Sequence, residues 1–147
     1  MSKIRIYLDN CCFNRPYDDQ TQLRIELETK SKLFIQQKII EGKYILVSSV
    51  ILEYENSKNP YHLRQIAINN FLTNSEIYIG ECDEVIDIAR VLTDKGLRIK
   101  DASHLACAVY GGCDYFITTD DRLLKFKHEK IKIVSPIAFL SEEDEII

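Results

Sequence analysis

Residues 101–121, DASHLACAVYGGCDYFITTDD, form a helix–turn–strand unit that ends in two carboxylates. Asp101 is a favourable first residue for a helix over DASHLACAVY, and Gly111-Gly112 would end that helix. The apolar run at 115–118 then predicts a buried strand, which Asp120-Asp121 follow directly. A strand that ends at polar residues after a helix is typical of parallel α/β sheets, whose ligand sites lie at the carboxyl ends of the strands.

The rest of the chain continues this alternation. Further strands are expected over residues 4–8, 44–47, 77–79 and 131–134. Further helices are expected over 22–41, from Ser48 or Ser49 to just before Asn59-Pro60, over 62–73, and from Asp83, as its cap, to Gly96. The pattern predicts right-handed crossovers and a three-layer α/β/α sandwich with a mainly parallel sheet. No repeat or linker interrupts it, so residues 1–147 are expected to form one domain.

Two of these helices carry apolar residues at helical spacing, which predicts their inner faces. For 22–41 the predicted face consists of Leu23, Leu27, Leu33, Phe34, Ile39 and Ile40. For 62–73 it consists of Leu63, Ile66, Ala67 and Phe71.

Composition narrows the class of protein. The 147 residues are 46% hydrophobic and 29% charged, which is ordinary for a globular fold. No apolar run approaches the roughly 20 residues that cross a bilayer, and no signal peptide is recognisable, so no membrane partner and a cytoplasmic location are expected. The net charge of −4 gives no global attraction to nucleic acid, although a local basic rim or a bound cation would supply one.

Cysteine usage argues against a zinc site. The five cysteines include no CxxC pair, and the three histidines are scattered. They are expected to be reduced and mostly buried. The alternative is that one cysteine is a reactive nucleophile. Cys11 is the best candidate by position, although no histidine lies near it in the sequence.

Acids recur where strands are expected to end. Asp9 follows the first strand, Glu53 and Glu55 lie in the helix after the second, and Asp101, Asp120 and Asp121 flank a late strand. Each also has an ordinary explanation as a helix cap or a solvated charge. Glu53 and Glu55 are two residues apart, so their side chains point about 200° apart on a helix and only one can face a given site.

Several carboxylates gathered at one sheet edge would need a cation, because like charges at about 4 Å repel and raise each other's pKa. Oxygen-only ligands favour Mg²⁺ or Mn²⁺ over zinc. Such an ion binds phosphate oxygens and lowers the pKa of water, which points to phosphodiester hydrolysis. No Walker loop or GxGxxG motif is present.

Four segments, in order, resemble the motifs of PIN-domain ribonucleases, the fold of the VapC-like toxins of toxin–antitoxin pairs. They are IYLDNCCFNRP, SSVILEYENSKNP, IKDASHLACAVYGG and CDYFITTDDRLL. The resemblance implies that Asp9, Glu55, Asp101 and Asp120 form an acidic quartet that holds Mg²⁺ or Mn²⁺ and is catalytic. It further implies a toxin-type endoribonuclease that cleaves RNA, with an antitoxin as partner and a homodimer as a further expectation.

Other positions receive supporting roles. Asn10 and Thr118 are expected to orient the acids, and Asp121 to be a supporting acid or, preferably, the cap of the next helix. His104 is expected to be a packed histidine rather than a base. Tyr17 and Tyr54 are candidates for stacking on unpaired bases, with a core position as the commoner role for Tyr54. Phosphate contacts are expected from Arg15, Lys58, Arg98 and Lys100.

Three other functions fit the same sequence. The chain could be an RNA- or protein-binding domain with weak or no catalysis, a metal-dependent nuclease that acts on DNA or in RNA processing, or a fold whose acids are only caps. Metal-dependent cleavage of RNA and DNA pools, compared between the wild type and acid variants, would separate these hypotheses.

Overall fold

A five-stranded sheet forms the centre of the computed structural model, which describes residues 3–143 and 145. Every pair of neighbouring strands is parallel, and the order is β3-β2-β1-β4-β5. The strands are β1 (Arg5–Leu8), β2 (Ile45–Ser49), β3 (Ile77–Ile79), β4 (Tyr115–Ile117) and β5 (Lys132–Val134). The five expected strands and the parallel sheet are therefore confirmed, with ends that differ by a few residues at most.

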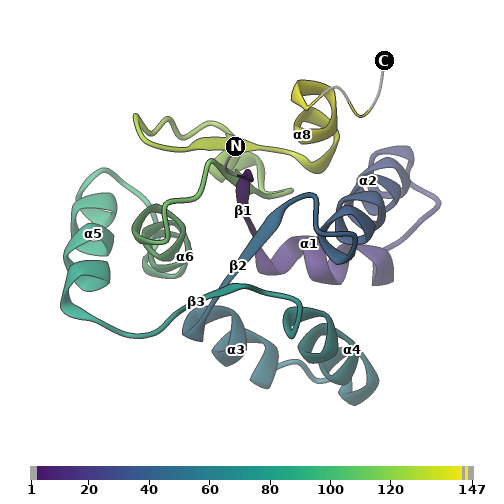
Figure 1. The fold of residues 1–147 in the computed structure, drawn as a ribbon, viewed down its shortest axis with the longest axis horizontal. Helices are drawn as coiled ribbons and strands as arrows, with labels where there is room; N and C mark the ends of the chain where they lie inside the picture. Colours follow the sequence, from purple (N-terminus) through teal and green to yellow (C-terminus); the bar gives the residue numbers. More distant parts are fainter. Residues whose placement is uncertain (1–2, 144, 146–147) are drawn as a thin grey trace.

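Helices cover both faces of this sheet. They are α1 (Asn10–Asn14), the 3₁₀ helix η1 (Arg15–Tyr17), α2 (Leu23–Ile40), α3 (Val50–Ser57), α4 (His62–Leu72), α5 (Asp83–Asp94), α6 (Ile99–Tyr110), α7 (Asp121–Leu124) and α8 (Pro136–Glu142). In Figure 1, α5 and α6 lie on one side of the sheet and α2 on the other, which confirms the three layers. None of the helices in the described part of the chain has the length and apolarity needed to span a bilayer.

The strand order sets the place of a ligand site. From β1 the chain builds β2 and β3 on one side and later β4 and β5 on the other, so the order reverses between β1 and β4. In parallel α/β sheets ligands bind at such a switch point, outside the carboxyl ends of the strands. The N–H of Asp9 donates to the carbonyl of Ile117 at 2.9 Å and ties the two strand ends together.

The core lies on both faces of the central strands. Because helices cover both faces, β1 and β4 are almost continuously apolar and buried rather than alternating. The ring of Tyr7 in β1 stacks on that of Phe116 in β4, with centroids 5.4 Å apart. All five cysteines are free thiols, and Cys12, Cys107 and Cys113 are buried, as expected for reduced cysteines in a core.

The inner face predicted for α2 is wrong except at Ile39. Its buried residues are Glu28, Thr29, Lys32, Ile35 and Ile39, whereas Leu23, Leu27, Leu33, Phe34 and Ile40 are exposed. The buried charges have partners from elsewhere in the chain. Arg15 pairs with Glu28 at 3.0 Å, and the ammonium of Lys32 lies 5.3 Å from the ring centroid of Phe13. These tertiary partners override the apolar pattern of the helix.

The face predicted for α4 is only partly right. Phe71 is buried, but Leu63, Ile66 and Ala67 are exposed, and Ile68 and Leu72 complete the inner face instead.

Three helix starts also differ from the prediction. Cys82, not Asp83, is the cap of α5, and α6 begins two residues earlier than expected, after Arg98. Asp101 therefore lies in the first turn of α6, where its charge still complements the helix dipole. Asp121 does not cap α7; Asp120 does, by accepting the N–H of Arg122 at 2.8 Å.

Two helical segments were not predicted. The first is α1 with η1, directly after β1. The second is α8, where Ser135 caps the helix by accepting the N–H of Ala138 at 3.1 Å and Pro136 occupies the first turn. Serine followed by proline is a readable helix start, so this signal was present in the sequence.

Candidate functional site

The four acids predicted from the sequence line one cavity of about 440 Å³ at the switch point of the sheet. They come from four elements. Asp9 follows β1, Glu55 lies in α3, Asp101 lies in the first turn of α6, and Asp120 follows β4. The other side chains around the cavity are Asn10, Cys11, Asn14, Asp18, Arg98 and Lys100. The parallel topology thus gathers carboxylates that are far apart in the sequence.

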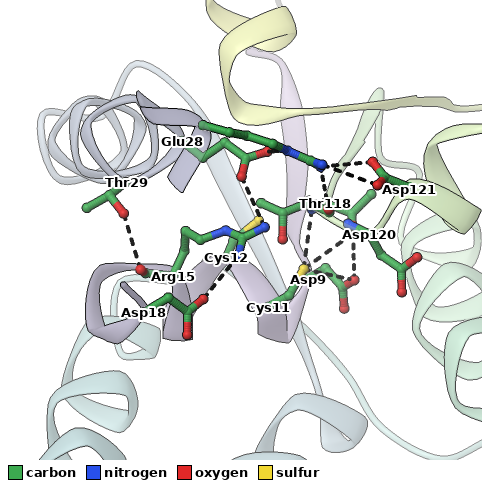
Figure 2. A network of polar contacts seen from close by, with 12 residues as sticks. Asp9, Cys11, Cys12, Arg15, Asp18, Glu28, Thr29, Thr118, Asp120 and Asp121 are labelled. Carbon is green, nitrogen blue, oxygen red and sulfur yellow. Dashed lines mark hydrogen bonds and ion pairs between the residues drawn. The ribbon is translucent and has the colours of Figure 1, made fainter. Parts of the chain in front are cut away.

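Asp9 is buried where β1 and β4 end and lines this cavity; Figure 2 shows it beside Cys11 and Thr118. Its carboxylate accepts hydrogen bonds from the hydroxyl of Thr118 at 2.8 Å and the N–H of Asn10 at 2.8 Å, and the thiol of Cys11 lies 3.5 Å away. Burial raises the pKa of Asp9 above its ordinary value, and the nearby His104 and these hydrogen bonds only partly oppose that effect. Asp9 also caps α1, so one carboxylate shapes the turn and faces the cavity.

Glu55 is held from three sides. The side-chain amide of Asn10 donates to it at 2.9 Å, the ammonium of Lys100 lies at 3.0 Å, and the Nε2 atom of His104 contacts its other oxygen. Burial by itself raises the pKa of Glu55, but His104 and Lys100 together outweigh burial and lower it. Glu53, the alternative acid in this helix, is exposed and does not line the cavity.

Arg98 links the remaining two acids. Its guanidinium lies 3.2 Å from the carboxylate of Asp101 and 3.4 Å from that of Asp120. The side chain of Arg98 is 60% exposed and that of Lys100 is 67% exposed, so both cations sit at the solvent side of the carboxylates. The cavity is therefore lined by acids, and two long, exposed basic side chains lie at its rim.

The acids share a cavity but not, in this arrangement, one coordination sphere. Within residues 3–143 and 145, no three His, Cys, Asp or Glu side chains are placed so as to hold one metal ion. Ion pairs with Arg98 and Lys100 hold three of the carboxylates instead. The donor set itself is one of carboxylate oxygens, which matches the preference of Mg²⁺ and Mn²⁺.

The supporting residues divide into two groups. Thr118 and Asn10 touch the acids: Thr118 donates to Asp9 and accepts the N–H of Asp120 at 3.1 Å, while Asn10 donates to Glu55. Asp121 lies outside the cavity and pairs with Arg24 of α2 at 2.9 Å, and that guanidinium lowers the pKa of Asp121.

The four predicted phosphate contacts are also not equivalent. Arg98 and Lys100 line the acidic cavity, and Lys58 lines a second cavity that adjoins it. The structure does not bring Arg15 to either cavity. Its guanidinium is largely buried against Glu28 at 3.0 Å and Asp18 at 3.1 Å, so it joins η1 to α2 (Figure 2).

A buried chain of hydrogen bonds runs from the cavity into the core, and sequence reasoning did not find it. The hydroxyl of Tyr7 lies 2.7 Å from the Nδ1 atom of His104 and 2.7 Å from the hydroxyl of Ser49. His104 in turn contacts Glu55. His104 is buried, as expected for a packed histidine, but its packing also holds an acid of the cavity. Asp18 likewise lines the cavity without any sequence signal that singled it out.

Comparison with known proteins supports the fold but not a specific activity. No protein-family model matches the sequence, and the comparison with curated proteins finds no match. A chain in the structure of VapBC2 from Rickettsia felis bound to a DNA fragment from their promoter matches with a TM-score of 0.56 at 15% identity, over 88% of this chain and 97% of that one. A chain of FitAcB from Neisseria gonorrhoeae matches with a TM-score of 0.57 at 12% identity, over 90% of this chain and 98% of that one. These likenesses establish a PIN-like parallel α/β fold.

Proposed function

We propose that this chain is a Mg²⁺- or Mn²⁺-dependent endoribonuclease of the toxin type, acting in the cytoplasm. The observation that carries the proposal is the position of Asp9, Glu55, Asp101 and Asp120. Four carboxylates from four separate elements line one cavity at the switch point of the sheet. Asp9 and Asp120 also cap helices, but Glu55 and Asp101 do not, so capping alone does not account for the cluster.

Charge balance supports a cation at these acids. With Asp18, five carboxylates line the cavity against two cationic side chains, Arg98 and Lys100. A phosphodiester would be repelled by this excess of negative charge. Burial raises the pKa of Asp9, and a cation beside that carboxylate would favour its charged form. The donor atoms therefore fit Mg²⁺ or Mn²⁺.

In the proposed enzyme, Asp9, Glu55, Asp101 and Asp120 would hold the ion. A divalent ion so bound supplies charge stabilisation at phosphate and lowers the pKa of water. Thr118 and Asn10 fix the carboxylates of Asp9 and Glu55 by hydrogen bonds. Arg98 and Lys100 lie at the rim with exposed side chains and would bind the phosphate oxygens of the RNA.

An antitoxin is the proposed partner. Among the structures to which this fold is similar are those of VapBC2 and FitAcB, and the sequence motifs resemble those of the toxins of toxin–antitoxin pairs. In this chain α2 exposes several large apolar side chains, which is a feature of protein interaction surfaces: Leu23, Leu27, Leu33, Phe34 and Ile40. A second copy of the chain is the other proposed occupant of such a surface.

A binding domain with weak or no catalysis is the second candidate. One observation favours it: Arg98 and Lys100 already pair with three of the four acids. A site neutralised by its own cations could bind RNA or protein without a metal. The two functions differ in whether divalent ions bind and whether RNA is cut.

The test is cleavage of a mixed pool of single-stranded and structured RNA, beside a DNA pool, as Mg²⁺ or Mn²⁺ is titrated. The chain offers two matched pairs of variants. Glu55→Gln is compared with Glu53→Gln in the same helix, and Asp120→Asn with Asp121→Asn next to it. In each pair only the first residue lines the cavity.

We expect metal-dependent cutting of RNA by the wild type and both controls. Glu55→Gln and Asp120→Asn should lose more than the roughly 10- to 100-fold that loss of an outer-sphere partner causes. Cutting of DNA alone would indicate a nuclease of another class, one that acts on DNA. Metal binding without cutting of either pool would favour the binding domain, and absence of metal binding would refute the acidic site.

A further inference from the structure

A second cavity, of about 670 Å³, adjoins the acidic one. It lies between α3, the start of α4 and the start of α6. The two cavities share Asn10, Asn14, Glu55 and Lys100, so they form one continuous depression. A volume of this size falls within the range of about 300–1,000 Å³ that small-molecule sites occupy.

Aromatic rings stand exposed along this second cavity. The side chains of Tyr54 and Tyr61 both line it and are 63% and 56% exposed. Tyr54 is thus a surface residue and not part of the core. Arg64 lies between two rings, with its guanidinium carbon 3.8 Å from the centroid of Tyr61 and 4.4 Å from that of Tyr17. Stacking on Arg64 holds these rings in place while leaving ring surface open to solvent.

The cavity is also basic. The ammonium of Lys58 lies 5.2 Å from the ring centroid of Tyr54, and Arg64 and Lys100 line the same wall. Neither Lys58 nor Arg64 takes part in an ion pair with any carboxylate in the described part of the chain. Their charge is therefore free for a ligand, although the whole chain has a net charge of −4.

We infer that this cavity, here called the tyrosine groove and defined by Tyr54, Lys58, Tyr61 and Arg64, binds unpaired nucleotides next to the acidic site. The inference rests on the proposed function and adds where the flanking bases of the substrate lie. Sites for single strands combine a basic groove with aromatic rings on which bases stack, whatever their sequence. The tyrosine groove contains both, and Lys100 continues its charge into the acidic cavity.

The substrate class follows from the rings. Bases in a duplex already stack on each other and do not present their faces, so a stacking groove selects unpaired RNA. An acidic protein segment would also satisfy Lys58 and Arg64, but it has no flat groups for two exposed tyrosines. Unpaired nucleotides use the rings, the cations and the shared wall together.

Binding of a short, unstructured, fluorescent oligoribonucleotide in EDTA tests this site without cleavage. We expect Tyr61→Ala to weaken binding about 5- to 150-fold, the range for loss of one stacked base. Tyr61→Phe, which keeps the ring, should restore it. Arg64→Gln should weaken binding and reduce the dependence of log K on log salt by about 0.7, as for one lost phosphate contact.

Matched controls lie away from the groove. Tyr110→Ala removes a tyrosine of similar exposure, 48%, at the far end of α6, and Arg90→Gln removes an exposed arginine of α5. Both should leave binding unchanged. A duplex of the same sequence should bind more weakly and not respond to Tyr61→Ala. All substituted side chains are exposed or lie in the groove wall, and thermal unfolding would verify that the variants fold.

Several results would overturn the inference: no binding of the oligoribonucleotide, an equal loss in the Tyr110→Ala control, no loss in Tyr61→Ala, or no rescue by Tyr61→Phe. Preference for a poly-glutamate peptide over RNA would also overturn it and favour a protein ligand. Failure here is separable from failure of the nuclease. If wild-type cleavage stands while groove variants bind normally, only the groove is refuted; if groove variants lose binding while nothing is cut, the groove stands without the nuclease.

Discussion

The hydroxyl of Tyr7 connects the buried core to the acidic cavity, and the substitution Tyr7→Phe tests this connection. The substitution keeps the ring that stacks on Phe116 and removes one buried oxygen. That oxygen contacts the Nδ1 atom of His104 and the hydroxyl of Ser49, both at 2.7 Å. With Glu55 ionised, a neutral His104 donates from Nε2 to Glu55 and accepts from Tyr7 at Nδ1. If the ring is charged, Nδ1 donates instead, and in both cases a buried nitrogen loses its partner.

The magnitude follows from this geometry. The hydroxyl of Ser49 still accepts a hydrogen bond from the N–H of Leu52 at 3.2 Å, so it is not left without a partner. The ring nitrogen of His104 is left bare, and a buried polar atom without a partner costs about 1–3 kcal/mol. We expect the free energy of unfolding to fall by that amount and Tm to fall by about 2–4 °C for each kcal/mol. Because His104 would then orient Glu55 less well, cleavage should require up to about tenfold more Mg²⁺.

Calorimetry or thermal denaturation gives the first quantity, and a Mg²⁺ titration of RNA cleavage gives the second. Tyr115→Phe is the matched control, because its hydroxyl donates to Glu143 at 3.0 Å, outside the cavity. That variant should be destabilised by about 1 kcal/mol or less and keep the metal dependence of the wild type. Equal loss of stability in both variants, together with an unchanged Mg²⁺ requirement, would refute the idea that this hydrogen-bond chain positions Glu55.

Two further predictions concern buried charges. Burial raises the pKa of Asp9, so between its ordinary and its raised pKa the folded state binds more protons than the unfolded state, and stability falls as pH rises through that window. Asp9→Asn should therefore raise Tm in EDTA at neutral pH while abolishing both cleavage and stabilisation by Mg²⁺; a lower Tm would contradict this. Burial lowers the pKa of Lys32 to about 8, so wild-type stability should rise as pH increases from about 8 towards 10. At about 1.4 kcal/mol for each pKa unit, its charge costs roughly 3 kcal/mol, of which the rings of Phe13 and Phe71 return a part. Lys32→Met should thus stabilise the protein by about 1–3 kcal/mol at pH 7 in denaturant titrations, and a loss of stability would show that the ring contacts dominate.

Lys32 also shows why part of the fold could not be predicted. The alternation of strands and helices predicted the sheet correctly, because each strand is a short apolar run between turn residues. The face of α2 depended on partners distant in the sequence, since Glu28 is buried through Arg15 and Lys32 through two phenylalanine rings. A helical pattern cannot reveal partners of that kind. Most of the large apolar residues of α2 face solvent instead, although a pattern of hydrophobicity alone places them in the core.

The candidate site divides in the same way. That carboxylates would meet at the carboxyl ends of the strands follows from parallel topology, and a sequence reveals it. The pairing of Arg98 with two acids depends on the start of α6, which lies two residues before the predicted one. Tyr7 lies between the apolar residues Ile6 and Leu8 of β1, so its hydrogen bond to His104 has no periodic signature. Contacts between side chains of different elements are what the sequence leaves undetermined.

The environment of Asp9 differs from that of the other three acids, and this asymmetry bears on how the site would work. Arg98 and Lys100 pair with Glu55, Asp101 and Asp120, whereas Asp9 has only hydrogen-bond donors and no ion pair within the described residues. Its carboxylate is buried, and burial raises its pKa. A divalent ion would interact most favourably with the carboxylate of Asp9. The two rim cations, released from their carboxylates, would then be free to bind phosphate. In the proposed enzyme the same two side chains would neutralise the acids before RNA arrives and bind its phosphates afterwards, which would let a chain of net negative charge present an acidic cavity to RNA.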